Sequence, residues 1–348
     1  MTSTPTTPYV PLEQLQAARI RLQPYLKPSP LVPADAYKAR LGCELSLKLE
    51  LLQPTHAFKV RGALNALLTM PKRDLELGVV TASGGNHGLG LAYAARLLGV
   101  RAVVTLPTTT PELRAETIRE LGGEVIIHGD DWNAADDLAH KLVREHGYTY
   151  LSPFDDPQVM AGQGTIALEI LEQAPQTDLI VCSVGGGGLI SGIASAVKQL
   201  RPEVRVVGVE TLGADSMAQS LGRGELVTLP RFTSVAESLG TRRSGERPFA
   251  IVRAGVERVV TVSDARAVTE LLFTLDREKL LIEPAASCTL AALADGLVPD
   301  IAGHRVVSVM CGGNTTLAQV NAWRERFGVA AKQATTASPE EVRATKPL

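Results

Sequence analysis

The sequence predicts an α/β protein of two domains, each a parallel sheet covered by helices on both faces. Short runs rich in valine and isoleucine alternate with longer helical patterns along most of the 348 residues. The runs are apolar throughout rather than at every second residue, which is typical of parallel strands buried on both faces. The length supports two domains, because a typical domain has about 150 residues.

The first series of alternating elements falls in residues 71–155, which we expect to form a small domain inserted into a larger one. Its strands and helices are predicted at Val79–Thr81, Leu89–Leu98, Ala102–Leu106, Pro111–Leu121, Val125–Ile127 and Trp132–Glu145. Each apolar run is followed by a helical pattern, and helical crossovers of this kind join parallel strands.

The large domain is expected to combine residues 1–70 with residues 156–328. Its clearest elements are predicted at Leu179–Val184, Leu189–Leu200, Val204–Val209, Val256–Val262, Ala265–Leu275, Val306–Met310 and Thr315–Arg326. Residues 1–11 are rich in Thr, Pro and Ser, and residues 329–348 are rich in Ala, Thr, Lys and Pro. Because neither end has a sustained apolar period, we expect a tail at each end.

Charge and cysteine content exclude several classes of protein. With 35 Lys and Arg against 37 Asp and Glu, the formal net charge is −2, so the chain lacks the basic footprint of a nucleic-acid or membrane-surface binder. No apolar run approaches the roughly 20 residues of a membrane span, and we expect no secretory signal. The cysteines are far apart, which excludes a disulfide framework or a zinc ribbon. A cytoplasmic protein is therefore expected. The four cysteines are Cys43, Cys182, Cys288 and Cys311.

Three glycine-rich turns follow predicted strands, at the positions where open α/β sheets bind their ligands. They are Ser83–Gly88, Gly185–Gly188 and Cys311–Asn314. In the second turn, four consecutive glycines present backbone amides with no Cβ in the way. The helix that follows adds partial positive charge, so this turn predicts a phosphate site.

The tetraglycine turn matches neither of the common nucleotide motifs. Ile193 stands where a P-loop needs lysine, and Ile190 and Ser191 stand where a dinucleotide fingerprint needs its third glycine. Glu210 nevertheless ends the next strand, where an acid would bind the ribose of a dinucleotide. A Rossmann-type oxidoreductase is therefore one rival interpretation, and a non-catalytic ligand-binding protein is another.

The segment Lys48–Ala63 decides against these rivals. It resembles the cofactor-lysine segment of the fold type II pyridoxal-phosphate enzymes, in the serine/threonine dehydratase and serine racemase family. The three glycine turns follow in the family's order, Pro153–Asp156 and Glu283–Ala285 also match dehydratases, and the similarity runs from about residue 20 to 325. The resemblance implies a tryptophan synthase β-like architecture, with pyridoxal 5'-phosphate in the cleft between the two domains.

The resemblance also implies a role for each matching residue. Lys59 would form the Schiff base with the cofactor, beside the ring of Phe58. The remaining implied contacts are the cofactor phosphate on Gly185, Gly186, Gly187 and Gly188, the ring hydroxyl on Asn86, the pyridine nitrogen on Cys311, and the substrate carboxylate on Ser83, Gly84, Asn86 and His87.

Elementary chemistry supports the roles of Lys59 and Cys311. A Schiff base needs an unprotonated amine, which a partly desolvated lysine supplies. A neutral thiol leaves the pyridine nitrogen largely unprotonated, which favours β-elimination over transamination. We therefore expect Lys59 to remove the α-proton of a 3-hydroxy amino acid such as L-threonine or L-serine, with loss of water and release of a 2-oxo acid and ammonia.

The sequence departs from the family pattern at several positions. His56 and Ala57 replace small or hydroxyl residues before Phe58-Lys59, so we expect an altered pocket wall. Gly84 replaces the serine that acts as a second acid/base in serine racemases. Because glycine has no proton to give, elimination is expected with little or no racemisation.

Other consequences of the resemblance are less specific. A mono- or divalent cation site maps to Glu210, Ala214 and Ser216, where Ser216 replaces an acid although Asp215 is adjacent. A homodimer is expected, without the C-terminal regulatory domain of biosynthetic threonine dehydratases. A serine racemase-type enzyme, a β-replacement synthase and another hydroxyamino-acid lyase stay open. So do bulkier substrates such as phenylserine or 3-hydroxyaspartate, sensed by a wall that we assign to Ser234–Leu239 and Arg242-Arg243.

Overall fold

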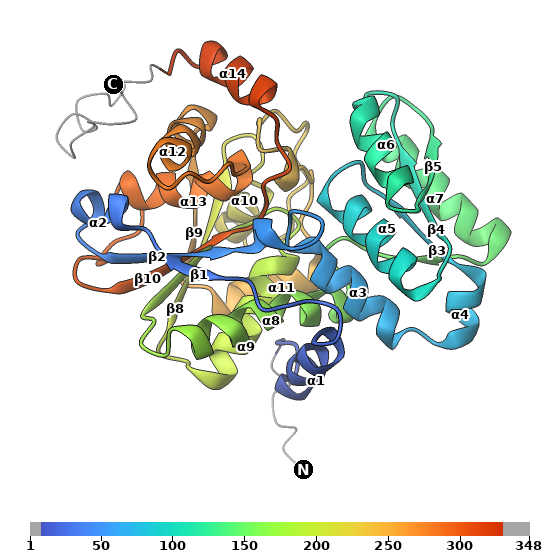
Figure 1. Cartoon of the computed structure of the whole chain (residues 1–348), viewed down its shortest axis with the longest axis horizontal. Coiled ribbons are helices and arrows are strands. Elements are labelled where there is room, and N and C mark those ends of the chain that lie inside the picture. Colours follow the sequence, from blue (N-terminus) through green and yellow to red (C-terminus); the bar gives the residue numbers. More distant parts are fainter. Residues whose placement is uncertain (1–7, 330–348) are drawn as a thin grey trace.

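The computed structural model describes residues 8–329, which form two β-sheets flanked by helices (Figure 1). The larger sheet has six strands in the order β1-β2-β10-β7-β8-β9, and the smaller has four in the order β5-β4-β3-β6. All neighbours in the smaller sheet are parallel, and so are all but one pair in the larger. The predicted α/β class with two parallel sheets is confirmed.

The larger sheet departs from the prediction at one edge. Its strands are β1 (Leu31–Pro33), β2 (Glu44–Leu49), β7 (Leu179–Ser183), β8 (Arg205–Thr211), β9 (Arg258–Val262) and β10 (Arg305–Met310). β1 pairs with β2 in the antiparallel sense. Only residues 34–43, with the short helix α2 (Asp35–Leu41), connect these two strands, and a parallel crossover needs a longer segment.

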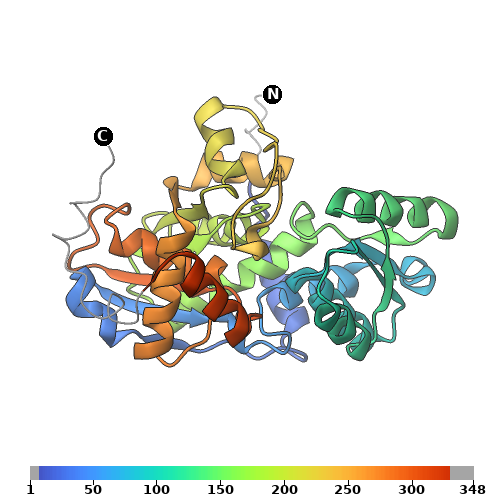
Figure 2. The same cartoon turned by 90° about the horizontal axis from the view of Figure 1, so that it is seen from above.

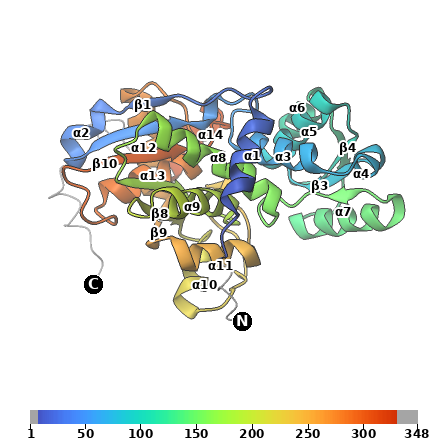
Figure 3. The ribbon, with the colours of Figure 1, turned by 90° about the horizontal axis from the view of Figure 1, so that it is seen from below.

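Helices cover both faces of the larger sheet. α13 (Pro284–Ala294) contacts β7, β8 and β10 and carries α12 (Asp264–Arg277), which α14 (Leu317–Arg326) also contacts. Towards the other face, α9 (Gly188–Leu200) contacts β7 and β8 and packs on α8 (Pro157–Gln173), which α1 (Leu12–Leu22) contacts. Helix α11 (Glu246–Gly255) packs on α9, and with α10 (Ser216–Arg223) it forms the projection seen at the bottom of Figure 3.

The smaller sheet lies to one side of the larger one, as Figure 2 shows from above. Helix α7 (Trp132–His146) covers one face, whereas α5 (Asn86–Leu98) and α6 (Glu112–Glu120) pack against β4 and β5. Its strands are β3 (Val79–Ala82), β4 (Ala102–Leu106), β5 (Glu124–Ile127) and β6 (Thr149–Tyr150). Helix α3 (Lys59–Thr69) contacts both α5 and α8. It therefore joins the two halves of the molecule, by which we mean each sheet with the helices that cover it.

We keep residues 71 and 155 as the proposed limits of the inserted domain. Helix α4 (Lys72–Leu77) directly follows the first limit and contacts β6 of the smaller sheet, and α8 begins just after the second limit.

Most of the two predicted tails, residues 1–7 and 330–348, lies outside the described residues. Among the described residues, Val10 is buried and its N–H donates to Ser195 Oγ at 3.0 Å, and Val329 is buried in a cluster with Val235 and Val268. The prediction of a tail is wrong at Val10 and Val329, because one buried side chain can anchor a segment that has no apolar period.

No helix in residues 8–329 is both long enough and apolar enough to cross a bilayer.

Candidate active site

Lys59 is the first residue of α3, the helix that contacts both α5 beside the smaller sheet and α8 beside the larger one. The segment before it is tied to the turn after β10: Phe58 N–H donates to the Cys311 carbonyl at 3.0 Å, and Gly313 N–H donates to the His56 carbonyl at 2.9 Å. Ala57 and Gly312 form an isolated bridge between these hydrogen bonds. The structure therefore joins the predicted lysine segment to the third glycine turn.

The Lys59 amine is held by a backbone carbonyl. Its Nζ donates to the Pro153 carbonyl at 2.7 Å. Burial lowers the pKa of Lys59 to about 8, and the nearby Cys311 opposes this change only in part. Much more of this amine is unprotonated near neutral pH than in an ordinary lysine, as a nucleophile or base requires.

The tetraglycine turn closely contacts its surroundings, so that side chains there would collide. A Cβ at Gly186 would lie 2.1 Å from the Phe154 ring, and one at Gly188 would lie 2.8 Å from the Phe154 Cα. Gly187 has a φ of +94°, which disfavours other residues. Because α9 begins at Gly188, the amides of this turn lie at a helix N-terminus, which favours the binding of an anion.

One cavity brings the lysine, the glycine turn and Cys311 together. It has about 380 Å³ of empty space, part of it open to solvent. Its lining residues are Phe58, Lys59, Phe154, Ser183, Gly185, Gly186, Gly187, Gly188, Leu189, Ser238, Leu239, Ala285 and Cys311. The amine of Lys59 suits the aldehyde of pyridoxal phosphate, and the amides of the tetraglycine turn suit its phosphate. The residues present therefore fit the implied cofactor.

Cys311 lines this cavity as a neutral thiol. It directly follows β10, and its Sγ accepts a hydrogen bond from Ser183 Oγ at 3.5 Å. Burial raises the pKa of Cys311 to about 12, mainly by desolvation. Ser183 is not among the predicted site residues, although its place at the end of β7, just before the glycine turn, is a signal for such a role.

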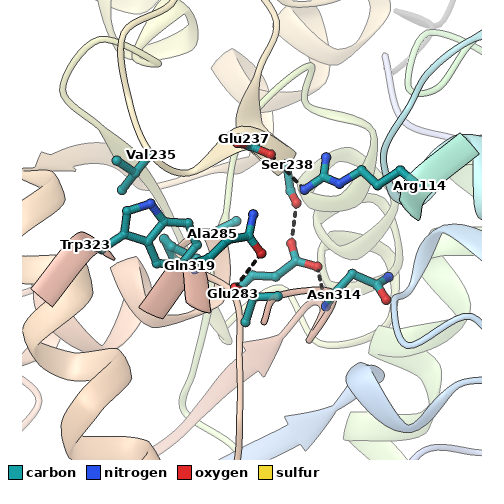
Figure 4. A pocket seen from close by; sticks show the side chains of 11 residues that line it. Arg114, Val235, Glu237, Ser238, Glu283, Ala285, Asn314, Gln319 and Trp323 are labelled. Atoms are coloured by element: carbon teal, nitrogen blue, oxygen red, sulfur yellow. Dashed lines mark hydrogen bonds and ion pairs between the residues drawn. The ribbon is translucent and has the colours of Figure 1, made fainter. Parts of the chain in front are cut away.

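Asn86 belongs to a polar cluster with Ser238, Glu283 and Asn314, and Figure 4 shows these three partners, although Asn86 itself lines neither cavity. Its Nδ2 donates to Glu283 Oε1 at 3.0 Å and to Ser238 Oγ at 3.3 Å, while its Oδ1 accepts from Asn314 Nδ2 at 2.7 Å. Glu283 also accepts from Ser238 Oγ and from the N–H of Asn314. Asn86 comes from the smaller half and its partners from the larger, so this cluster ties the two halves at the site.

The Figure 4 pocket adjoins the Lys59 cavity and has about 240 Å³ of partly open space. At its rim, Arg114 of α6 forms an ion pair with Glu237 at 2.7 Å, a second contact between the halves. Ser238 and Ala285 line both pockets, so the two spaces share a wall. Of the wall predicted at Ser234–Leu239 and Arg242-Arg243, Ser238 and Leu239 line the Lys59 cavity, whereas the two arginines line neither space. His56 does not line them either and is exposed.

The Ser83–His87 turn occupies the start of α5, where backbone amides lack intrahelical partners. Ser83 Oγ accepts from the Gly85 N–H at 3.3 Å. His87 Nε2 donates to the Leu151 carbonyl at 3.1 Å, which leaves Nδ1 as a buried acceptor with no partner among the described residues. Burial, assisted by Lys59, lowers the pKa of His87 to about 3, so this histidine stays neutral.

The residues of the predicted cation site have protein partners. Glu210 accepts from the N–H groups of Met217 and Ala218 at 3.1 and 2.7 Å and so caps α10, while Ser216 Oγ bonds to Ser244 Oγ at 2.9 Å. Burial raises the pKa of Glu210 to about 8. Ala214 lies buried next to this site. Residues 8–329 hold no group of three or more His, Cys, Asp or Glu side chains placed to bind a metal ion, and the cation site stays a prediction.

Comparisons with known proteins agree with this geometry. A family model described as pyridoxal-phosphate dependent enzyme matches residues 22–312. The chain is 39% identical over 322 residues to an L-threonine ammonia-lyase of Geobacter sulfurreducens, covering 92% of this chain and 80% of that protein. It is 37% identical to a phenylserine dehydratase of Ralstonia pickettii, with 91% and 97% covered. The structure of maize serine racemase superimposes with a TM-score of 0.85 at 31% identity, covering 91% of this chain and 97% of that one.

Proposed function

Because this chain belongs to the family of pyridoxal-phosphate dependent enzymes, we propose that it is an ammonia-lyase that converts L-threonine, L-serine or a related 3-hydroxy amino acid into a 2-oxo acid and ammonia. The observation that carries this proposal is the shared cavity of Lys59, the tetraglycine turn and Cys311. Pyridoxal phosphate, when bound, withdraws electrons from the α-carbon of an attached amino acid, which makes the α-proton removable.

Each group on the cavity wall has a definite part in this reaction. The amides of Gly185–Gly188 would hold the phosphate of the cofactor, and the buried, neutral thiol of Cys311 would serve as the partner of its ring nitrogen. Lys59 would hold the cofactor through its amine, and the same amine, with its pKa lowered to about 8, would serve as the base for the α-proton. The first amides of α5, after Ser83 and Gly84, bind the substrate carboxylate.

His87, a neutral hydrogen-bond acceptor near the Lys59 amine, is compatible with the role of Lys59 as the base. His87 cannot compete with Lys59 for a proton near neutral pH, because its own pKa is about 3. Glu283, Ser238 and Asn314 hold the Asn86 amide in one orientation and use both of its N–H groups, so Asn86 would exchange one of these hydrogen bonds for one to the cofactor hydroxyl.

The relatives and the cavity suggest which 3-hydroxy amino acid is the substrate. L-threonine is favoured by the name of the Geobacter relative, and phenylserine by the Ralstonia relative, which the chain covers almost completely. The space at Ser238 and Ala285, which continues into the Figure 4 pocket, supports a substituent larger than hydrogen on the β-carbon. A racemase is disfavoured because Gly84 has no side chain opposite Lys59.

The test is 2-oxo acid formation from a panel of L-threonine, L-serine, phenylserine and 3-hydroxyaspartate. Borohydride reduction of the cofactor-loaded protein followed by peptide mapping is expected to label Lys59. Lys59→Ala is expected to abolish activity, whereas Lys72→Ala, at a side chain that is 90% exposed, is expected to leave it unchanged. Full activity in Lys59→Ala, or no 2-oxo acid from any member of the panel, would overturn the proposal.

The exposed apolar side chains and the buried cysteines bear on the oligomeric state and the cellular location of the enzyme. We propose a homodimer, since large apolar side chains such as Ile20, Leu52 and Leu317 are more than half exposed and a second copy could cover them. Light scattering on the purified protein tests it. All four cysteines are buried free thiols, which suits the reducing cytoplasm that we propose as its location.

A further inference from the structure

Four charged side chains are buried together on the side of α3 away from the cavity. They are Lys48 at the end of β2, Glu50 in the short 3₁₀ turn Glu50–Leu52, Arg61 in the first turn of α3, and Glu169 on α8. Lys48 and Glu50 are fully buried, Arg61 is 2% exposed and Glu169 is 7% exposed. Charged groups are rarely so deeply buried, and when they are, they need partners for every hydrogen-bonding atom.

Arg61 meets that requirement in full. Its Nε and Nη2 donate to the two Glu50 oxygens at 2.7 and 2.8 Å, and its Nη1 and Nη2 donate to the two Glu169 oxygens at 2.5 and 2.9 Å. Its Nη1 also donates to Thr165 Oγ1 at 3.1 Å. All five N–H groups of the guanidinium are thereby used, which fixes its position and its orientation.

Lys48 completes the cluster from the other side. Its Nζ donates to Glu169 Oε2 at 2.6 Å, to the Ser29 carbonyl at 2.7 Å and to Gln173 Oε1 at 2.8 Å. Two cations and two carboxylates cancel, so the cluster has no net charge. Consistent with this, the lowered pKa of Lys59 arises from burial and is opposed by Cys311, with no contribution from the four buried groups.

Arg61 follows Lys59 by two residues. Two helical residues point about 200° apart, so a Lys59 side chain directed into the cavity places Arg61 on the opposite side of the helix. Any rotation or slide of α3 that moved the Lys59 amine would also have to break the hydrogen bonds of Arg61. A buried ion cluster is a poor way to gain stability, since apolar residues of similar volume serve as well.

We propose that Arg61 is a positioning residue for Lys59: by locking the first turn of α3 to β2 and α8, it sets the place at which the amine meets the cofactor aldehyde. The cluster acts on the position of the amine and not on its charge. This inference rests on the proposed attachment of the cofactor to Lys59.

The test compares two ligands of the full chain freed of its cofactor. Pyridoxal 5'-phosphate uses Lys59 covalently, whereas 4-deoxypyridoxine 5'-phosphate lacks the aldehyde and uses only the glycine turn and the ring contacts. Arg61→Lys keeps the charge but loses the planar fork. We expect it to weaken pyridoxal phosphate at least about tenfold, with the affinity for the deoxy analogue unchanged.

A second variant keeps the test decisive if Arg61→Lys does not fold. Arg61→Met/Glu50→Met removes one cation and one anion together and leaves the Lys48–Glu169 ion pair in place. The same selective loss of pyridoxal phosphate is expected. Equal weakening of both ligands, or no weakening of either, would overturn the inference.

Arg40 provides the matched control. It forms a two-point ion pair with the fully buried Glu270 at 2.8 and 3.0 Å, within a separate cluster on α12. Arg40→Lys is expected to lower the melting temperature without changing the ratio of the two affinities. A wild-type chain that binds pyridoxal phosphate no more tightly than the analogue would instead contradict the proposed function, so the two failures are distinguishable.

Discussion

The Lys59 amine and the Cys311 thiol line the same cavity, and burial moves their pKa values in opposite directions. Desolvation lowers the pKa of Lys59 to about 8 and raises that of Cys311 to about 12. Removal from water disfavours the charged form of each group, so the amine loses its proton more readily than an ordinary lysine while the thiol keeps its proton. Burial alone thus gives both side chains the protonation behaviour that their proposed roles require: a base in Lys59 and a neutral partner for the cofactor ring nitrogen in Cys311.

Lys59→Met is expected to stabilise the cofactor-free chain more at about pH 7 than at about pH 10. The folded amine titrates near 8 and the unfolded one near 10.4, so the folded chain bears the full penalty of a buried ammonium below pH 8. The penalty disappears as the pH rises from about 8 to about 10.4, and it amounts to at most about 3 kcal/mol. Urea unfolding at both pH values measures it. An equal gain at both would contradict the lowered pKa, and Lys72→Met is the exposed control.

Cys311→Ser is expected to keep elimination within about tenfold of the wild type, and Cys311→Asp to lose at least about a hundredfold. A hydroxyl leaves the ring nitrogen uncharged, as the thiol does, whereas a carboxylate would protonate it and shift the chemistry towards transamination. The ratio of 2-oxo acid turnovers to transamination events gives the readout. Cys43→Ser, at a buried cysteine outside the cavity, is the control. Unchanged elimination in Cys311→Asp would refute the neutral-nitrogen role.

Gly186→Ala is expected to weaken cofactor binding at least about tenfold, because its Cβ would lie 2.1 Å from the Phe154 ring. Titration of the cofactor-free chain with pyridoxal phosphate measures the change. Gly222→Ala in α10 is the matched control, since no atom lies within 4 Å of the added Cβ and the change favours the helix. If the two variants bind the cofactor alike, the amide cradle is not the phosphate site.

His56→Gly is expected to stabilise the protein by up to about 1 kcal/mol. His56 has a φ of +54° and an exposed side chain, and a left-handed backbone strains every residue except glycine by about 1–2 kcal/mol. The greater freedom of glycine in the unfolded chain offsets part of that gain. Thermal unfolding of His56→Gly and His56→Ala separates the backbone effect from loss of the side chain. A similar stability of the two variants would show that the left-handed backbone is not strained.

Secondary structure was predicted most accurately from the sequence where a segment has one dominant property, such as an uninterrupted apolar run. The strands at Val79, Ala102, Leu179 and Val306 are confirmed within one or two residues, because their apolar runs are flanked by turns. Helix α13 was missed: ten of its eleven residues are buried, and a helix that is apolar on all sides has no amphipathic period to detect. α8 is buried along most of its length and was missed for the same reason.

Some residues of the candidate site could be predicted from the sequence and others could not. Lys59, Cys311 and the tetraglycine turn could be selected, because their residue types suit the proposed chemistry and match a family resemblance. The carbonyl of Pro153 that holds the Lys59 amine has no sequence signature, since every residue has a carbonyl. The cluster of Asn86 and Glu283 joins positions almost 200 residues apart, and the third dimension alone brings them together.

Gly84→Ser is not expected to turn the enzyme into a racemase unless Thr110 is changed with it. A Cβ at Gly84 would lie 2.8 Å from Thr110 Cγ2 and 3.1 Å from its Oγ1, so this threonine fills the space that a second acid/base would need. Gly84→Ser/Thr110→Gly frees that space and is expected to raise the ratio of D-serine to pyruvate formed from L-serine, whereas Thr110→Gly alone is not. Chiral chromatography of the reaction measures both products. Racemisation as fast as elimination in the wild type would show that a proton donor other than residue 84 serves that face.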